Sequence, residues 1–310
     1  MMGHDARTPL NQGDTITIQE HNYTIREIIG SGGSCLVYYS EREPNEYECN
    51  IGIPTIPALI KEFYPLELAT YITRKPDGEL TVQATMQETF DTLKKRFESG
   101  VSEQAVFCIN DSNHSLPLPV FTLQNGTAYT AVILTHGQTL TDCAANLSIL
   151  EKAYVLTSLC NAVKKLHDSG KLYLDLKPSN IFVFEKEQDE SRRVALFDFD
   201  TVVGVTDAST TAIAFSEGWS PYEQIKQQKD GLSYPADIYA IGAVYYWMLS
   251  GKKVSDTVLD EIVRARFDFL DEIDSLHGNK RLKNTIGQIL SATLKRLPDK
   301  RAQRVEDIPL

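Results

Sequence analysis

The sequence lacks a hydrophobic segment long enough to enter a membrane. Its longest apolar stretch covers residues 240–249, whereas a helix that spans a bilayer needs about 20 such residues. The first fifteen residues are polar and contain none of the apolar core of a signal peptide. We therefore expect a chain without a membrane partner.

Cysteine is also scarce, and its spacing does not suggest a metal site. The five cysteines are odd in number and include no Cys-x-x-Cys pair; they lie at positions 35, 49, 108, 143 and 160. This pattern argues against a disulfide framework and against a structural zinc site. Reduced thiols are typical of the cytosol, so we expect a cytoplasmic protein.

The chain has fewer basic residues than acidic ones. The 31 lysines and arginines are outnumbered by 42 aspartates and glutamates, which leaves a formal net charge of −11. This balance argues against a nucleic-acid partner and against a polybasic patch for anionic lipids. With 42% hydrophobic and 24% charged residues, the composition is otherwise that of an ordinary globular protein.

The first part of the chain has the pattern of a small β-rich lobe. Five segments rich in β-branched and aromatic residues end at turns with Gly or Pro; they cover residues 23–29, 34–40, 58–63, 119–124 and 127–134. Asn125-Gly126 joins the last two, which is a strong signal for a β-hairpin. Residues 89–107 carry apolar side chains at helical spacing. We expect a five-stranded antiparallel sheet with one inserted helix.

Beyond His136-Gly137 the pattern changes to long helices. The clearest are residues 150–167 and 236–249, with short strands at 181–184 and 194–197. The hydrophilic stretch between those two strands is typical of a solvated turn. We therefore predict an α+β fold made of an N-terminal extension (1–22), a β-rich lobe (23–134) and a mainly helical lobe (135–310).

Two acidic motifs in the second lobe carry the strongest chemical signal. Residues 172–180 read LYLDLKPSN, and Asp198-Phe199-Asp200 follows the second short strand. Phosphoryl transfer to a hydroxyl needs one carboxylate that orients the attacking group and a second that holds Mg²⁺ together with an amide oxygen. Asp175 fits the first role, and Asn180 with Asp198 fits the second. Lys177 would neutralise charge on the moving phosphoryl group. The alternative is a turn without chemistry, and the order and spacing of these residues argue against it.

A glycine-rich turn and a lysine in the first lobe fit a nucleotide. Residues 29–37 read IGSGGSCLV, and glycines between two strands let a hairpin close over phosphates. A flexible turn is the plainer interpretation of Gly30, Gly32 and Gly33 taken alone. Lys61 lies on the third expected strand between apolar neighbours that would turn it inward, which is rare for an unpaired lysine. A lysine facing water at a sheet edge is the alternative.

Taken in order, these motifs resemble those of the Ser/Thr protein kinase family, in particular its bacterial members. The resemblance runs from about residue 23 to about residue 304 and includes SPYEQ at 220–224. It implies a two-lobed kinase fold, ATP and Mg²⁺ as cofactors, and a protein substrate with a Ser or Thr acceptor. A lysine two residues after the base, here Lys177 after Asp175, is typical of Ser/Thr kinases and not of tyrosine kinases.

The resemblance also implies roles in the nucleotide site. Lys61 would hold the α- and β-phosphates, with Glu103 preferred over Glu98 as its partner from the inserted helix. The adenine would lie between Val37 and Phe182, beside the hinge residues Ile133 and Thr135.

Four further residues are implied to have structural or acceptor-site roles. Ser216 would line the acceptor site, and Asp237 would bond the backbone of the catalytic loop. Glu223 and Arg301 would form a buried ion pair, in which each charge needs its partner.

Some positions depart from the family pattern. Cys35 replaces the third glycine of the turn, and Tyr173 replaces a His that mostly packs. Leu174 replaces an Arg that reads an activation-loop phosphate, which predicts activity independent of such phosphorylation. Asp200 replaces the Gly of DFG; it would strengthen Mg²⁺ binding, stiffen the loop or serve as a solvated turn residue.

The sequence is consistent with three functions. The first is a Ser/Thr kinase, favoured because Lys61, Asp175, Asn180 and Asp198 are all retained. The second is a kinase-like pseudoenzyme that binds nucleotide or scaffolds partners, suggested by the departures. The third is a small-molecule phosphotransferase, disfavoured by Lys177 and by the SPYEQ segment. The protein substrate, the upstream signal and the oligomeric state do not follow from the sequence.

Overall fold

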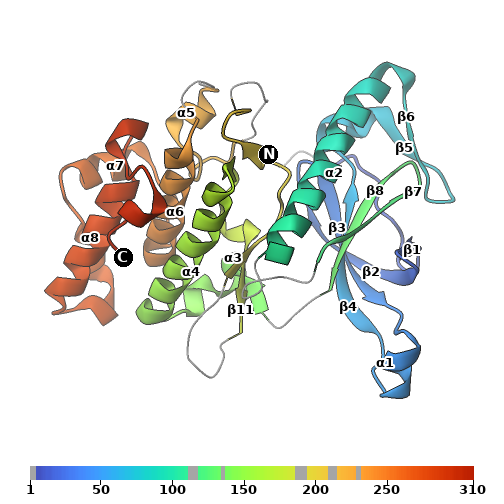
Figure 1. Ribbon diagram of the computed structural model, residues 1–310, viewed down its shortest axis with the longest axis horizontal. Helices are drawn as coiled ribbons and strands as arrows, with labels where there is room; N and C mark the ends of the chain where they lie inside the picture. The colour runs from blue at the N-terminus through green and yellow to red at the C-terminus, as the bar shows by residue number, and fades with distance from the viewer. Residues whose placement is uncertain (1–4, 111–117, 134–136, 186–193, 209–214, 228–231) are drawn as a thin grey trace. The chain divides into compact units, whose positions relative to one another are not determined.

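The computed structural model describes residues 5–110, 118–133, 137–185, 194–208, 215–227 and 232–310 (Figure 1). The chain divides into two compact units, Met1–Thr135 and His136–Leu310. Each unit has its own secondary structure and core and is described by itself.

The first unit is built on one antiparallel sheet (Figure 1). Its strands lie in the order β1 (Thr15–Ile18), β2 (His21–Ser31), β3 (Cys35–Arg42), β4 (Ile56–Phe63), β8 (Thr127–Ile133) and β7 (Val120–Gln124). The α+β class is confirmed, but the sheet has six strands rather than the five expected. The additional strand, β1, lies within the segment predicted as an extension. Its exposed–buried alternation covers four residues only, which is too short to stand out in a polar N-terminus.

The predicted hairpin joins β7 to β8. Asn125 and Gly126 have φ angles of +52° and +72°, the left-handed pair that a type I′ turn requires. A Cβ atom at Gly126 would lie 2.3 Å from the carbonyl oxygen of Leu80. Glycine is therefore required there on two grounds, and the hairpin places β7 at the edge of the sheet.

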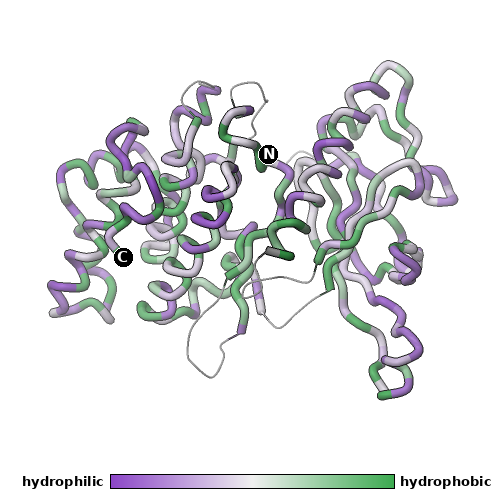
Figure 2. The backbone as a smooth tube through the Cα atoms, viewed as in Figure 1, coloured by the Kyte–Doolittle hydropathy of each residue, from purple (hydrophilic) through white to green (hydrophobic). Residues whose placement is uncertain are grey.

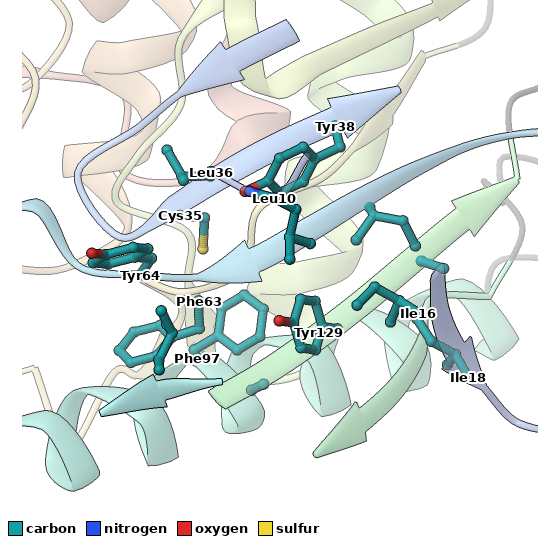
Figure 3. Packing of buried hydrophobic residues seen from close by; sticks show 14 of the residues in the cluster. Leu10, Ile16, Ile18, Cys35, Leu36, Tyr38, Phe63, Tyr64, Phe97 and Tyr129 are labelled. Atoms are coloured by element: carbon teal, nitrogen blue, oxygen red, sulfur yellow. The ribbon is translucent and has the colours of Figure 1, made fainter. Parts of the chain in front are cut away.

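The two outer strands of this sheet approach each other. The backbone N–H of Thr17 in β1 donates to the side-chain oxygen of Gln124 at the end of β7 (3.3 Å). The curled sheet holds a core to which β1, β3 and β8 contribute large side chains, and Leu10 joins it from before the first strand; Ile16, Ile18, Leu36, Tyr38 and Tyr129 are shown in Figure 3.

A long helix packs on the sheet. α2 (Gln87–Asn110) contains the predicted helical segment. Its Phe90 and Phe97 rings lie 5.2 and 5.6 Å from the Phe63 ring at the end of β4. The smaller elements of this unit are α1 (Glu46–Asn50), η1 (Leu66–Tyr71), β5 (Ile72–Arg74), β6 (Leu80–Val82) and η2 (Ala84–Met86).

A buried carboxylate lies in the first unit. Glu62 in β4 is fully buried and accepts hydrogen bonds from Tyr38 (2.7 Å), Tyr129 (2.6 Å) and Arg74 (2.6 Å). Burial, with the nearby Glu62 charge, raises the pKa of both tyrosines, so they remain donors. A buried charge that is paired and hydrogen-bonded in this way is tolerated. The network links β3, β4, β5 and β8.

The second unit is mainly helical, as predicted. Its helices are α3 (Leu140–Cys143), α4 (Ile149–Asp168), α5 (Tyr222–Ile225), α6 (Tyr234–Ser250), α7 (Asp256–Val263) and α8 (Lys280–Thr293), with short 3₁₀ turns. Its strands are β9 (Gly137–Thr139), β10 (Lys171–Leu172), β11 (Ile181–Phe184), β12 (Val194–Leu196) and β13 (Val203–Gly204). Ser148 and Glu151 form a capping box that starts α4.

The central helix α6 packs closely on α8. A Cβ atom at Gly242 would lie 2.2 Å from the Thr293 hydroxyl oxygen, so only glycine allows this approach. α6 ends at Gly251, which has a left-handed φ of +69°. Over the described part of the chain, no helix is both long and apolar enough to cross a membrane, and hydrophilic residues interrupt the helices in Figure 2.

Candidate active site

Asp175 lies at the centre of a hydrogen-bond cluster in the second unit. One carboxylate oxygen accepts from the Lys177 ammonium (2.7 Å) and from the Asn180 side-chain amide (2.9 Å). The other accepts from the Ser216 hydroxyl (2.8 Å). The structure thus brings together four residues selected from the sequence, including Ser216 from a distant segment.

Asp237 holds the backbone that leads to Asp175. Its carboxylate accepts from the N–H groups of Tyr173 (2.9 Å) and Leu174 (2.8 Å), as the family resemblance implies. It also contacts a ring nitrogen of His167 at 2.9 Å. His167 was not selected from the sequence, because a lone histidine near a helix end has no distinguishing signal.

Leu174 adopts a strained backbone. Its φ is +64°, a left-handed conformation that costs a non-glycine residue about 1–2 kcal/mol. Besides the bond to Asp237, its carbonyl accepts from the buried Gln224 side chain (2.6 Å). Such strain persists where surrounding contacts over-determine it, often at functional sites. Gln224 was also missed as a site residue, although it ends the SPYEQ segment.

The Leu174 side chain belongs to an apolar cluster. It is 2% exposed and packs with Leu172, Ala208, Leu232 and Ala236, and with the partly buried Val203, Val205 and Tyr234. The position that carries an Arg in many kinases therefore contributes to a core here. Val203, Val205 and Ala208, which follow Asp198-Phe199-Asp200, belong to this core.

Tyr173 does more than pack. Its hydroxyl donates to the Phe197 carbonyl, and its ring meets the Phe199 ring edge-on at 5.5 Å. The Thr201 hydroxyl donates to the Tyr173 carbonyl (2.8 Å). Burial, followed by the charges of Asp198 and Asp175, raises the pKa of Tyr173 well above its usual range. The hydroxyl therefore stays protonated and remains a donor.

The two predicted Mg²⁺ ligands lie on connected segments. The backbone N–H of Phe197 donates to the Asn180 carbonyl (3.2 Å), and Asp198 follows with a left-handed φ of +72°. The Asn180 amide nitrogen bonds Asp175, while its side-chain oxygen accepts a long bond from Ser179 (3.5 Å). An amide oxygen and a carboxylate are the hard ligands that Mg²⁺ takes, so these residues fit the ion.

Glu223 and Arg301 form the predicted ion pair. The two bonds measure 2.5 and 3.0 Å, and both side chains are almost fully buried. Arg301 also donates to the carbonyl of Lys295 at 2.7 Å. A paired and fully bonded buried charge supports the local fold, whereas removal of one partner costs about 3–5 kcal/mol.

The predicted nucleotide residues of the first unit lie along one line of the sheet. Gly30 pairs with Val37 across β2 and β3, and Val37 pairs with Lys61 across β3 and β4. Residues directly opposite in an antiparallel pair project from the same face, so Val37 and Lys61 share a face. The turn with Gly32 and Gly33 is closed by the Gly32 N–H, which donates to the Cys35 carbonyl (2.9 Å).

The remaining predicted nucleotide residues are distributed over both units. Ile133 ends β8 and pairs with Ala58, whereas Thr135 lies outside the described residues. In the second unit, Phe182 is buried in β11, with its ring 5.3 Å from the Phe184 ring. Glu103 and Glu98 are half-buried on α2, and the pairing of Lys61 with Glu103 stays a prediction.

Comparisons with known proteins identify a matching family model and several relatives. A family model described as protein kinase domain matches residues 120–307. Serine/threonine-protein kinase F of Synechocystis is 32% identical over 117 residues, which are 36% of this chain and 22% of that protein. Ribosomal protein S6 kinase 2 alpha of Xenopus laevis is 32% identical over 102 residues, 33% of this chain and 14% of that protein. The matched stretches thus span less than a quarter of these relatives.

Solved structures extend the likeness to the whole fold. The apo form of PpkA-294 has a TM-score of 0.66 at 22% identity and covers 97% of this chain and 98% of its own. The PknI kinase domain of Mycobacterium tuberculosis has a TM-score of 0.58 at 16% identity and covers 97% of this chain and 96% of its own. At such identities the likeness concerns the fold alone.

Proposed function

Because a protein kinase model matches more than half of its length, the chain belongs to the protein kinase family, and on that premise we propose that it transfers the γ-phosphoryl group of ATP to a protein serine or threonine. The observation that carries the proposal is the hydrogen-bond cluster around Asp175. It joins a carboxylate, an ammonium group, an amide and a hydroxyl within direct bonding distance.

The bond from Ser216 illustrates the role of Asp175. An aliphatic hydroxyl already donates to this carboxylate at 2.8 Å, so the same oxygen can orient the hydroxyl of an incoming substrate. General bases need hydrogen-bond reach of the proton that they accept. The Lys177 ammonium, 2.7 Å from the carboxylate, places a positive charge where the phosphoryl group would pass.

The same proposal assigns residues that would bind ATP and its Mg²⁺ ion. Mg²⁺, when held by Asn180 and Asp198, would neutralise phosphate charge. In the first unit, Lys61 would contact the α- and β-phosphates, and the turn of Gly30, Gly32 and Gly33 would offer backbone N–H groups. Two further features support a Ser/Thr acceptor: the 3.4 Å contact between Lys177 and Ser216, and the name of the Synechocystis relative, a serine/threonine-protein kinase.

We further propose that phosphorylation of the activation segment is not required. In kinases that need it, the added phosphate orders the segment through an Arg. Here the Leu174 side chain packs in one apolar cluster with Val203, Val205 and Ala208, and this packing would order the start of the segment without a phosphate.

The transfer reaction is tested with Asp175→Asn. The substitution keeps the shape of the side chain but replaces one acceptor oxygen with an NH₂ group and removes the base, so we expect a loss of about a hundredfold or more in kcat with labelled ATP, Mg²⁺ and a generic protein acceptor. Asp260→Asn is the matched control, because Asp260 pairs with Arg296 on the exposed surface. Equally poor labelling by wild type and Asp175→Asn would instead favour a nucleotide-binding pseudoenzyme.

A further inference from the structure

A segment before the first strand lies along the glycine-rich turn. We call residues 5–10 the strap. Within it, Arg7 reaches the end of the turn, and its side chain is 1% exposed. Its guanidinium donates to the carbonyl oxygens of Tyr64 (2.7 Å) and Cys35 (3.4 Å). Arg7 thus bridges the start of β3 and the residue that follows β4.

Hydrogen bonds to its backbone carbonyl groups hold the glycine-rich turn in place. The Gly33 carbonyl accepts from the Leu66 N–H (2.8 Å), and the Ser34 carbonyl accepts from the Tyr64 N–H (3.0 Å). The next carbonyl along the chain, that of Cys35, accepts from the Gly32 N–H (2.9 Å) and also from Arg7 (3.4 Å). Three successive carbonyl groups therefore bond to the strap or to the segment after β4.

This anchoring sets the direction of the backbone N–H groups. A peptide unit is planar and trans, so its N–H points away from its C=O. The Gly33 and Ser34 carbonyls share their peptide planes with the N–H groups of Ser34 and Cys35. When the carbonyls are held on one side, these N–H groups are turned to the other, where a row of N–H groups makes a site for phosphate oxygens.

The strap has further attachments. The Leu10 N–H donates to the Tyr38 hydroxyl (3.1 Å), and the Thr8 carbonyl accepts from Arg74 (2.8 Å); Figure 3 shows Leu10 beside Tyr38. Tyr38 and Arg74 both bond Glu62, the neighbour of Lys61 in β4. The strap is therefore connected to the strand that carries the proposed nucleotide lysine.

The charge of Arg7 is balanced within the strap. Two bonds of 2.7 and 2.9 Å join its guanidinium to the Asp5 carboxylate. The Arg7 hydrogen bond, with a smaller contribution from the Ser31 hydroxyl, lowers the pKa of Asp5 to about 2. A buried guanidinium that is paired and bonded to carbonyls is tolerated, and it holds its position between the two strands.

We propose that Arg7 is a positioning residue for the nucleotide: from the strap it bridges the Cys35 and Tyr64 carbonyls, and so fixes the segment after β4, which holds the Gly33 and Ser34 carbonyls, against the glycine-rich turn whose N–H groups would bind the phosphates of ATP. This inference rests on the proposed function, because it takes the turn as the phosphate site. It concerns nucleotide affinity and leaves the hydroxyl-orienting cluster at Asp175 unaffected.

The experiment compares Arg7→Ala, Arg7→Lys and the control Arg26→Ala in the full chain. Arg26 lies on β2 and pairs with Glu41 on the exposed surface. We expect Arg7→Ala to raise the KM for ATP, and the Kd of ATP measured by calorimetry, about tenfold, as expected for loss of a charged hydrogen bond. The kcat stays within about twofold. Arg7→Lys retains the cation and gives an intermediate value, while Arg26→Ala matches wild type.

A purely structural role predicts a different pattern. It lowers the thermal midpoint of Arg7→Ala and leaves the KM and Kd for ATP unchanged, which overturns the proposal. If Arg7→Ala does not fold, the Kd of ATP for Arg7→Lys distinguishes the positioning role from the structural role in the same way. Wild type that fails to bind ATP overturns both this inference and the proposed function. Wild type that binds ATP without phosphoryl transfer overturns the kinase proposal alone, and the Kd values still test Arg7.

Discussion

At the scale of single residues, the most unusual feature is backbone strain beside the proposed chemistry. Leu174 and Asp198 both have positive φ angles, which non-glycine residues rarely adopt. Leu174 precedes Asp175, and Asp198 is itself a predicted Mg²⁺ ligand. Leu174 is held by Asp237 and Gln224. The strained conformation is therefore maintained by buried hydrogen bonds, which makes Asp237 the residue on which the catalytic loop most depends.

Asp237→Asn is expected to destabilise the protein by about 3 kcal/mol. An amide has only one acceptor oxygen, so at least one of the two N–H groups now bound by Asp237 would face an NH₂ group in a buried position. Urea unfolding followed by circular dichroism measures the loss. The matched control Asp260→Asn, in an exposed pair, should change stability by less than about 1 kcal/mol. Similar losses in both variants would contradict this account of Asp237.

Residues close in sequence were easier to predict than residues joined only by the fold. Asp175, Lys177 and Asn180 form one short motif, so their chemistry is visible from their spacing. Arg7 and Tyr64, by contrast, are far apart along the chain, and their bond is between a side chain and a backbone carbonyl. No side-chain pattern marks a carbonyl as a partner, so such contacts cannot be inferred from residue types.

At the scale of elements, the long periodic segments were predicted, as were the short strands β11 and β12 beside the catalytic motifs, whereas other short strands were missed. The helices α2, α4 and α6 each contain the predicted segment. Apolar residues recur over several turns in α2 and α4, and α6 is buried almost all round. The strands β1, β5 and β6 have three or four residues each and were missed. In so few residues, alternation cannot be told from an irregular turn, and tertiary pairing decides the structure.

The activation segment provides an element-scale prediction. Changing Thr206, Ser209, Thr210 and Thr211 together to Ala should leave kcat/KM within about twofold of wild type, because the start of the segment already packs in the Leu174 cluster without a phosphate. Thr206 belongs to the described residues, and positions 209–211 lie outside them. Phosphatase-treated wild type, checked by mass spectrometry, is the control. A large fall in the activity of the fourfold Ala variant or of the phosphatase-treated wild type would refute independence from phosphorylation.

At the scale of the whole molecule, the chain consists of two units with separate cores. Separate cores favour separate unfolding transitions, since two-state behaviour is expected of single small domains. The chain has two tryptophans, and both lie in the second unit, where the Trp219 and Trp247 rings are 5.8 Å apart. Tryptophan fluorescence therefore reports on the second unit alone.

We predict that unfolding in guanidinium chloride gives different midpoints by fluorescence and by far-ultraviolet circular dichroism. Circular dichroism follows the strands and helices of both units, whereas fluorescence follows only the second. The control Leu36→Ala, a buried change in the first unit, should lower the dichroism midpoint and leave the fluorescence midpoint in place. Coincident curves for wild type and variant would mean that the chain unfolds as one cooperative unit.

The curl of the large sheet bears on how the protein behaves at high concentration. An open sheet exposes two rows of unpaired backbone groups, to which another molecule can add a strand and begin to aggregate. Here the contact between Thr17 and Gln124 brings the two outermost strands toward each other. Each row is thereby partly shielded by the other, and the same curl that encloses the core of the first unit also protects it from aggregation.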